Sequence, residues 1–322
     1  MSDKNLVKDS VKVGCVQMAP VWFDRGKTLE KVAAHLLEAA QAQCDLVVFG
    51  EALVPGYPFW IELTNGARFN DAAQKRMFAA YLEQGVVIER GDLNQICALA
   101  AQHRIAVYLG VMERAPDRGG HSLYCSLVYI DRDGRVQSVN RKVKPTYEER
   151  LAWAAGDGHG LKVHPLGPFT VGGLNCFENW VPLLRSALYA QGEDLHIAVW
   201  PGGGHNTPDI TRFIALESRS FVLSVSGLLR GSDIPQGTLF RDEMIASGRE
   251  FFANGGTAIA APNGDWILEP QIGTEGLFTA VLDHARVREE RQNFDLAGHY
   301  GRPDVTQLQV DRRRQSTVKF ED

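Results

Sequence analysis

The sequence predicts an α/β fold in which β-strands of mixed direction are covered by helices. Apolar, β-branched runs of strand length alternate along the chain with segments whose apolar residues repeat at helical spacing. Two of the apolar runs end in hairpin turn sequences, which indicates antiparallel strands beside parallel ones. Because no repeat, low-complexity linker or shift in composition divides the 322 residues, we expect a single domain over residues 1–322, with a short C-terminal tail from about residue 299.

The first half of the chain alternates strands and helices. Residues 11–18 form the first expected strand, and Leu29, Val32 and Leu36 lie on the apolar face of the helix that follows. The run 45–49 is apolar and typical of a strand buried on both faces. The further elements expected here are helices over about 68–84 and 92–103 and strands over 105–112, 123–130 and 135–142, the last two joined by a turn at Asp133-Gly134.

The second half continues this pattern. Thr207 and Pro208 are typical of a helix start, because a hydroxyl cap precedes a proline at the first helical position. The turn 262–265 joins two further strands. The elements expected here are strands over 169–174, 195–200, 221–226, 257–261, 266–269 and 277–282 and helices over about 181–191 and 207–220.

Composition and charge narrow the class of protein. Hydrophobic residues make up 44% and charged residues 23%, which excludes a disordered, collagen-like or coiled-coil chain. With 34 basic and 39 acidic residues the net charge is −5, so the chain lacks the basic excess of a nucleic-acid binder. The basic run Arg312-Arg313-Arg314 is expected to be a solvated tail, with a contact surface as the alternative.

Cysteine usage and hydropathy indicate a cytoplasmic protein that does not enter a membrane. The 5 cysteines are an odd number without a C-x-x-C pair, which argues against a disulfide framework and against a four-cysteine zinc site. The N-terminal residues are polar and lack a signal core. No stretch approaches the roughly 18 apolar residues that a membrane helix needs.

Two charged residues stand where an expected strand gives way to a loop, a position at which α/β sheets gather ligands and catalytic groups. Glu51 follows the strand 45–49, where poor solvation should raise its pKa and suit it to general-base catalysis. Lys142 ends the hairpin strand, and alternation places Lys142 and Lys144 on one face with Arg141 on the other. The simpler interpretations are a capping or ion-paired glutamate and a lysine that protects an edge strand.

Cys176 lies between an expected strand and an expected helix. A cysteine is intrinsically nucleophilic, and a helix N-terminus or a nearby lysine would increase its thiolate fraction. The alternative is a small buried hydrophobe. That is the interpretation given to the other four cysteines, Cys15, Cys44, Cys97 and Cys125.

A cysteine nucleophile needs a base. None of the nine histidines stands in a Cys-His protease context, although His205 in a glycine-rich segment is the nearest candidate. Glu51 and Lys142 offer another arrangement. The glutamate would accept the thiol proton, and the lysine would stabilise negative charge on the attacked group.

These segments resemble the nitrilase superfamily of carbon–nitrogen hydrolases, whose catalytic triad is Glu, Lys and Cys. The resemblance covers nearly the whole chain. The matching segments are 13–17, 20–24, Glu51 with Pro55-Gly56-Tyr57-Pro58, 141–150, Gly156-Asp157-Gly158, Cys176-Phe177-Glu178, Trp200-Pro201-Gly202 and 299–304. The Lys-Pro-Thr stretch and the Pro-Gly-Tyr-Pro stretch favour the nitrilase branch over the amidase and carbamoylase branches.

The resemblance implies a four-layer α-β-β-α sandwich with two mixed β-sheets. It assigns Glu51 as base, Lys142 as charge stabiliser and Cys176 as nucleophile, and it matches Glu149 to a second glutamate beside the triad. The implied reaction converts an organic nitrile to a carboxylic acid and ammonia through a thioimidate and a thioester, without a metal or organic cofactor. Family members pair through helices beside the active site, so we expect a homo-oligomer, a dimer or larger, that involves the helix near 181–190.

Aromatic residues near the triad are the candidates for substrate binding. These are Tyr57, Phe177, Trp180 and Trp200, which would make the pocket apolar. Phe177 stands where the nitrilase branch commonly has tryptophan, and Gly50 replaces the usual proline before the base, so the substrate range is open. The alternatives are an amidase or carbamoylase with the same triad and, more remotely, a non-catalytic scaffold.

Overall fold

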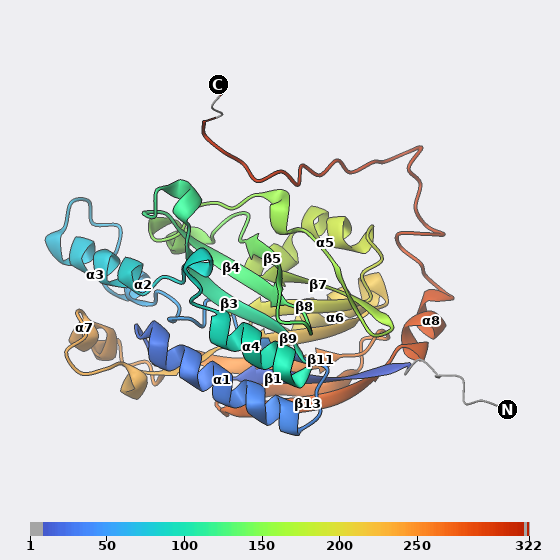
Figure 1. The fold of residues 1–322 in the computed structure, drawn as a ribbon, viewed down its shortest axis with the longest axis horizontal. Helices are drawn as coiled ribbons and strands as arrows, with labels where there is room; N and C mark the ends of the chain where they lie inside the picture. The colour runs from blue at the N-terminus through green and yellow to red at the C-terminus, as the bar shows by residue number, and fades with distance from the viewer. Residues whose placement is uncertain (1–8, 319–320, 322) are drawn as a thin grey trace.

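The computed structural model describes residues 9–318 and 321 of the chain. Two mixed β-sheets pack face to face, and helices cover their outer faces (Figure 1). The strand order is β13-β1-β2-β3-β4-β5 in the first sheet and β10-β11-β9-β8-β7-β6 in the second, where β12 pairs with β11. The predicted four-layer sandwich is confirmed.

Both sheets combine parallel and antiparallel pairs. The first contains β1 (Ser10–Gln17), β2 (Leu46–Phe49), β3 (Ala106–Arg114), β4 (Leu123–Ile130), β5 (Val136–Arg141) and β13 (Gly276–Asp283). The second contains β6 (His164–Leu166), β7 (Phe169–Asn175), β8 (Leu195–Trp200), β9 (Phe221–Ser226), β10 (Leu228–Arg230), β11 (Phe251–Ala260) and β12 (Trp266–Ile272). Strands β1, β2 and β3 are parallel to one another, as are β7, β8 and β9. The carboxyl ends of each parallel set therefore lie at one edge of its sheet.

The helices are mostly short. They are α1 (Arg25–Gln41), α2 (Trp60–Leu63), α3 (Ala72–Glu83), α4 (Asn94–His103), α5 (Pro182–Tyr189), α6 (Pro208–Ser218), α7 (Arg241–Ala246) and α8 (Ala285–Arg291). Two of the single-turn 3₁₀ helices matter for the site, namely η3 (Tyr147–Leu151) and η5 (Cys176–Trp180).

Three apolar layers hold the sandwich together. The central layer lies between the sheets, and Leu195, Ile197 and Val199 of β8 face into it. Ala198 and Trp200, on the opposite face of β8, pack in a separate cluster with residues of α6. A third cluster joins α1 and α4 to the outer face of the first sheet. The strict alternation along β8 therefore sends side chains to two different layers.

Two helix starts differ from the sequence-based expectation. The helix expected from about residue 68 begins at Ala72, because the Asp71 carboxylate accepts hydrogen bonds from the Ala73 and Gln74 N–H groups. Helix α6 begins at Pro208 as expected, but the Thr207 hydroxyl makes no capping hydrogen bond. Both expected hairpin turns are present, with Gly134 and Gly264 at positive φ.

Several short elements were not predicted. They are α2, β6, β10, α7 and α8, each of three to seven residues. Such lengths span too little of a helical or strand period to show in the sequence. Strand β11 also begins at Phe251, earlier than expected, and includes two glycines at positive φ.

The C-terminal segment runs along the outside of the sandwich after α8 (Figure 1). Arg314 donates a hydrogen bond to Oδ1 of Asp157 at 2.9 Å, and the Gln315 N–H donates to Oδ2 of the same carboxylate at 2.9 Å. Arg313 points outward with 85% of its side chain exposed. The expectation of a solvated basic run therefore describes Arg313 but is wrong for Arg314, which ties the segment to the domain.

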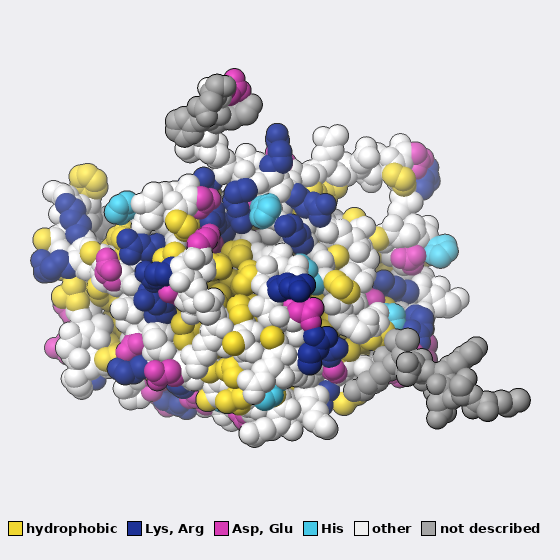
Figure 2. Space-filling model, viewed as in Figure 1, with side chains coloured by type: hydrophobic (Ala, Val, Ile, Leu, Met, Phe, Trp, Pro, Cys, Tyr) yellow, Lys and Arg dark blue, Asp and Glu magenta, His cyan; other side chains and the backbone are white. Residues whose placement is uncertain are grey.

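Basic and acidic side chains are interspersed over the face of the molecule in Figure 2. Within the described part of the chain, none of the helices is both long enough and apolar enough to span a membrane.

Candidate active site

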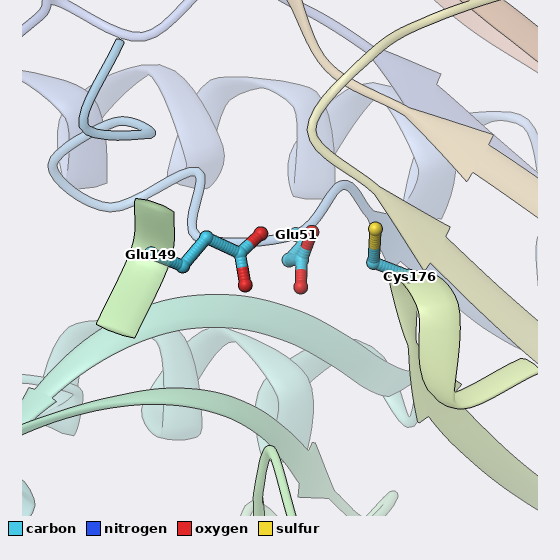
Figure 3. Close-up of side chains that lie close together, drawn as sticks. All are labelled: Glu51, Glu149 and Cys176. Atoms are coloured by element: carbon cyan, nitrogen blue, oxygen red, sulfur yellow. The ribbon is translucent and has the colours of Figure 1, made fainter. Parts of the chain in front are cut away.

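The three residues that the sequence placed at strand ends meet where the edges of the two sheets adjoin. Glu51 follows β2, Lys142 follows β5 and Cys176 follows β7. The Glu51 N–H donates to the carbonyl of Trp200, the last residue of β8, at 3.1 Å, which connects the two sheets at this edge. Figure 3 shows Glu51 between Glu149 and Cys176. The structure therefore brings all four predicted catalytic residues together.

Lys142 lies at the centre of this group. Its Nζ donates to Oε1 of Glu51 at 2.8 Å and to Oε2 of Glu149 at 2.8 Å, and its side chain is fully buried. Burial acts to lower the pKa of Lys142, but the neighbouring acidic groups of Cys176, Glu51 and Glu149 outweigh it and raise that pKa well above its usual value. The lysine therefore remains a cation and supplies a fixed positive charge.

Strand alternation did not predict this placement correctly. Strand β5 ends at Arg141, so Lys142 and Lys144 do not share a face of the sheet. Lys142 is buried in the site and Lys144 is exposed. Arg141 is also buried, in an ion pair with Glu113.

Glu149 is held by three donors, one of which caps its own helical turn. Its Oε1 accepts from the Tyr57 hydroxyl at 2.9 Å, and its Oε2 accepts from the Thr146 N–H at 2.6 Å and from Lys142. The residue thus closes the capping box of η3 and orients Lys142 at the same time.

Cys176 occupies a tight turn between β7 and η5. Its backbone φ is +46°, in the left-handed region, which costs a residue with a side chain about 1–3 kcal/mol. The turn is closed by Glu178, whose Oε2 accepts from the Asn175 N–H at 2.8 Å. Oε1 of Glu178 accepts from the Val143 N–H at 2.7 Å, so the same carboxylate joins the cysteine turn to the residue after Lys142.

Glu51 has the properties of a base. Burial raises its pKa to about 7, although the adjacent Lys142 acts in the opposite direction. Its Oε2 is buried and has no hydrogen-bond partner within the described part of the chain. A carboxylate with a pKa near neutrality and a vacant oxygen is suited to accept and return a proton.

The thiol of Cys176 differs from the sequence-based expectation. Burial raises its pKa well above the usual value, and the opposing effects of Lys142 and of the Phe177 N–H do not compensate. The expected increase in thiolate is therefore wrong for the free protein. The thiol has to lose its proton as it attacks, and the donor atoms of Glu51, Glu149 and Cys176 lie within 4.8 Å of one another.

Two carboxylates and a thiol are also a donor set that metal ions use. Here Lys142 already donates to both carboxylates, so its ammonium group occupies the position of a cation between them. The arrangement suits proton transfer and charge stabilisation on an attacked group.

Cys125 is a member of the site that the sequence interpretation missed. It is fully buried on β4, as expected of a small hydrophobe, but its Sγ lies 3.3 Å from Oε1 of Glu51. The hairpin register was the available signal, because β4 pairs Ser126 with Arg141 and so places Cys125 beside Lys142. The Lys142 N–H in fact donates to the Cys125 carbonyl at 2.7 Å.

The aromatic residues expected to bind substrate are placed differently from one another. Tyr57 lines a small cavity beside Glu51. Phe177 and Trp180 are 42% and 47% exposed, and Trp200 is buried with its indole N–H donating to Ser224. The cavity lining comprises Pro20, Glu51, Leu53, Gly56, Tyr57, Phe59, Pro201, Gly227, Leu228 and Leu229.

His205 is exposed, so Glu51 and not His205 is the base candidate that the structure places beside Cys176.

Fold and site together define an α-β-β-α sandwich with a buried carboxylate, ammonium and thiol where its two sheets adjoin. The family model described as carbon-nitrogen hydrolase matches residues 12–292. The chain belongs to this family and is an enzyme.

Curated relatives match almost the whole chain. A protein named nitrilase 2, from an unknown prokaryotic organism, is 34% identical over 314 residues, which cover 97% of this chain and 96% of that protein. An aliphatic nitrilase of Rhodococcus rhodochrous is 32% identical, and the alignment covers 96% of this chain and 85% of that protein. A bifunctional nitrilase/nitrile hydratase of Nicotiana tabacum is 32% identical over 97% of this chain and 89% of its own.

Solved structures share the fold at low sequence identity. The NitFhit protein of C. elegans superposes with a TM-score of 0.71 at 16% identity, over 97% of this chain and 70% of that one. An amidase from Nesterenkonia has a TM-score of 0.63 at 16% identity, over 91% of this chain and 98% of that one.

Proposed function

We propose that this enzyme is a nitrilase, which hydrolyses an organic nitrile to a carboxylic acid and ammonia. The observation that supports this most directly is the arrangement of Cys176, Glu51 and Lys142, three buried groups that can act on one small electrophile. Relatives named nitrilase at 32–34% identity over nearly the full chain point to the same reaction.

The first half of the proposed reaction forms a covalent intermediate. The Cys176 sulfur adds to the nitrile carbon while Glu51 accepts the thiol proton. That proton is passed to the nitrile nitrogen, whose developing charge Lys142 stabilises, and the product is a thioimidate. The raised pKa of Glu51, about 7, allows the carboxylate to take up this proton and to release it again.

The second half consumes two waters. One water, deprotonated by Glu51, adds to the thioimidate carbon, the nitrogen leaves as ammonia, and a thioester remains. A second water attacks the thioester and releases the carboxylic acid, while the sulfur regains its proton. In this scheme Glu149 orients Lys142, and Tyr57 orients Glu149.

The cavity beside Glu51 has a volume of about 10 Å³, room for no more than a water molecule, so a substrate has to displace its walls, whose chemistry favours a neutral, apolar group. Apart from Glu51, its described lining consists of glycine, proline, leucine and aromatic residues, and none of these is Lys or Arg. A substrate with its own carboxylate, such as a carbamoyl amino acid, would find no cationic partner there. Phe59, Leu228 and Leu229 would instead pack against an aliphatic or aromatic group.

Ammonia release from a substrate panel tests this proposal. The panel comprises acetonitrile, a longer aliphatic nitrile, phenylacetonitrile, the corresponding amides and an N-carbamoyl amino acid. We expect the highest kcat/KM for one of the larger nitriles, and no turnover by Cys176→Ala. A lead of more than about tenfold for the amides or for the carbamoyl compound would replace the nitrilase assignment with an amidase or carbamoylase.

We also propose that the enzyme is a homo-oligomer assembled through α5 and α6. Apolar side chains are exposed on and beside these helices, namely Trp180, Val181, Leu183, Phe213 and Leu216. A second copy would cover them. Light scattering should give at least a dimer, and Leu183→Glu should reduce it; a fully active monomer at assay concentration would rule the assembly out.

The proposed compartment is the cytoplasm. All five cysteines are unpaired, and the proposed chemistry requires Cys176 to remain reduced. Fractionation of cells that express the untagged protein would test this localisation.

A further inference from the structure

A buried chain of polar side chains lies behind Cys176, on the side of the second sheet that α5 and α6 cover. His196 interrupts the apolar strand β8 and is fully buried, as is Glu193 just before that strand. Both carboxylate oxygens of Glu193 lie 3.0 Å from Nδ1 of His196, and Nε2 of His196 lies 2.8 Å from Oδ1 of Asn179. None of these three residues takes part in the reaction proposed above.

The hydrogen bonds among Glu193, His196 and Asn179 lead in one direction, toward Cys176. Nδ2 of Asn179 donates to the Cys176 carbonyl at 2.8 Å and to the Leu174 carbonyl at 3.3 Å. Because carbonyls only accept, the amide orientation is fixed, and Oδ1 of Asn179 must accept a proton from Nε2 of His196. Nδ1 of His196 then shares a further proton with the Glu193 carboxylate. Each member thus orients the next, from Glu193 to the backbone of Cys176.

This series of hydrogen bonds ends at Cys176, the residue of the site with a strained backbone. Cys176 has a positive φ, and such a conformation persists only where surrounding contacts fix it. Asn179 fixes the Cys176 carbonyl from one side, while Arg185 donates to the Asn179 carbonyl at 2.7 Å and holds that turn in place. The orientation of this peptide also sets the position of the Phe177 N–H, which faces the sulfur.

We propose that Glu193, His196 and Asn179 are positioning residues that hold the Cys176 turn in its reactive orientation. A fully connected buried network specifies one arrangement, because breaking any link leaves a buried polar group without a partner. Sub-ångström shifts of a nucleophile reduce the fraction of molecules in an attack geometry. The kinetic part of this proposal rests on the proposed nitrile hydrolysis, whereas the effect on thiol reactivity does not.

A double-mutant cycle between Glu193 and Asn179 tests this positioning role. Glu193→Leu is similar in volume but removes the hydrogen-bond partner of Nδ1 of His196, and Asn179→Ala removes the link to Cys176. We expect each single variant to lower kcat about 10- to 100-fold with KM changed less than about threefold, and to slow alkylation of Cys176 by iodoacetamide. The double variant should lose no more than the worse single variant, because both changes break one chain.

The matched control is His164→Gln. His164 is also a buried histidine, on β6, but it bonds Ser138 and stacks on Tyr129. The His164→Gln variant should have a lower Tm but an unchanged kcat and an unchanged alkylation rate. If Asn179→Ala does not fold, Asn179→Ser, which keeps a shorter donor, takes its place. Losses that multiply in the double variant, or single variants with normal kcat and normal alkylation, would overturn the proposal. Slowed alkylation in a protein that hydrolyses no nitrile would reject the proposed function alone.

Discussion

The ammonium group of Lys142 lies 2.8 Å from Oε1 of Glu51, and neither side chain has any exposed surface. Lys142 is also 2.8 Å from Glu149, so one cation is shared by two buried carboxylates. Lys142, Glu51 and Glu149 together have one negative charge in excess when both carboxylates are ionised. Burial raises the pKa of Glu51 to about 7, and the nearby negative charge of Glu149 acts in the same direction, so Glu51, which has an oxygen without a hydrogen-bond partner in the described part of the chain, readily takes up a proton.

Removing the charge of Glu51 should abolish most of the activity. We expect Glu51→Gln to lose at least about 1,000-fold in kcat, because an amide cannot accept the thiol proton. For the wild type, kcat/KM should rise with pH through about 7, as Glu51 loses its proton. A pH profile that is flat between 5 and 8 would contradict the role of Glu51 as base.

Stability should follow the opposite trend with pH. The pKa of Glu51 is raised on folding, so its contribution to stability is complete below the unfolded value of 4.5 and is lost as the pH rises through about 7. Glu51→Gln does not titrate. The Tm of the variant relative to wild type should therefore increase between pH 5 and pH 8, measured by thermal unfolding in parallel buffers.

Lys142 should tolerate no substitute. Lys142→Arg should be inactive, since a planar guanidinium is wider than the ammonium that fits between Glu51 and Glu149. Lys142→Met should also be inactive and should lose about 3–5 kcal/mol of unfolding free energy, because it leaves two buried carboxylates without their cation. Urea unfolding at pH 8 measures this loss. Part of it should be recovered at pH 5, where Glu51 can be protonated.

Cys176→Ala should fold and show no turnover. The thiol is small and 7% exposed, so its loss removes the nucleophile at little cost in packing. Circular dichroism and Tm establish the fold, and ammonia release establishes the activity. Retention of even a tenth of the wild-type rate on the best substrate would show that another group attacks.

Cys125 should affect catalysis, unlike the buried cysteines Cys15 and Cys44. Its thiol lies against Glu51 and acts to lower the pKa of that carboxyl, so Cys125→Ala should shift the acid limb of the pH profile to higher pH. Cys125→Ser keeps a donor and should move the limb back. Cys15→Ala is the matched control, since Cys15 is buried between the sheets and should change stability alone. Identical pH profiles for all three variants would show that the contact with Glu51 has no catalytic effect.

The sequence was most informative where one local pattern decides the structure. Apolar runs such as 45–49 and the Asp-Gly turn of the first hairpin predicted β2 and the β4–β5 pair correctly. Glu51 and Cys176 could be singled out because each directly follows such a run. The organisation of the chain as a single domain with a tail stays a prediction, as do the individual catalytic roles.

The rest depends on contacts between distant segments. Strand alternation misplaced Lys144, because β5 ends one residue before Lys142, and nothing local marks that end. The raised pKa of Cys176 follows from complete burial, which a sequence does not reveal. His196 did leave a signal, a lone polar residue inside an apolar buried strand. Its partner Asn179, 17 residues away, could be identified only in three dimensions.

The site divides between the two sheets, with Glu51 and Lys142 attached to the first and Cys176 to the second. The distance from base to nucleophile is thus also a measure of the spacing between the sheets, which the side chains of the central layer maintain. Tyr108, Tyr129 and Phe169 act as spacers in that layer. An enlarged or truncated spacer would move the halves of the site relative to each other without touching either. In directed evolution, gains and losses of rate should therefore arise deep in the interior as well as around the substrate.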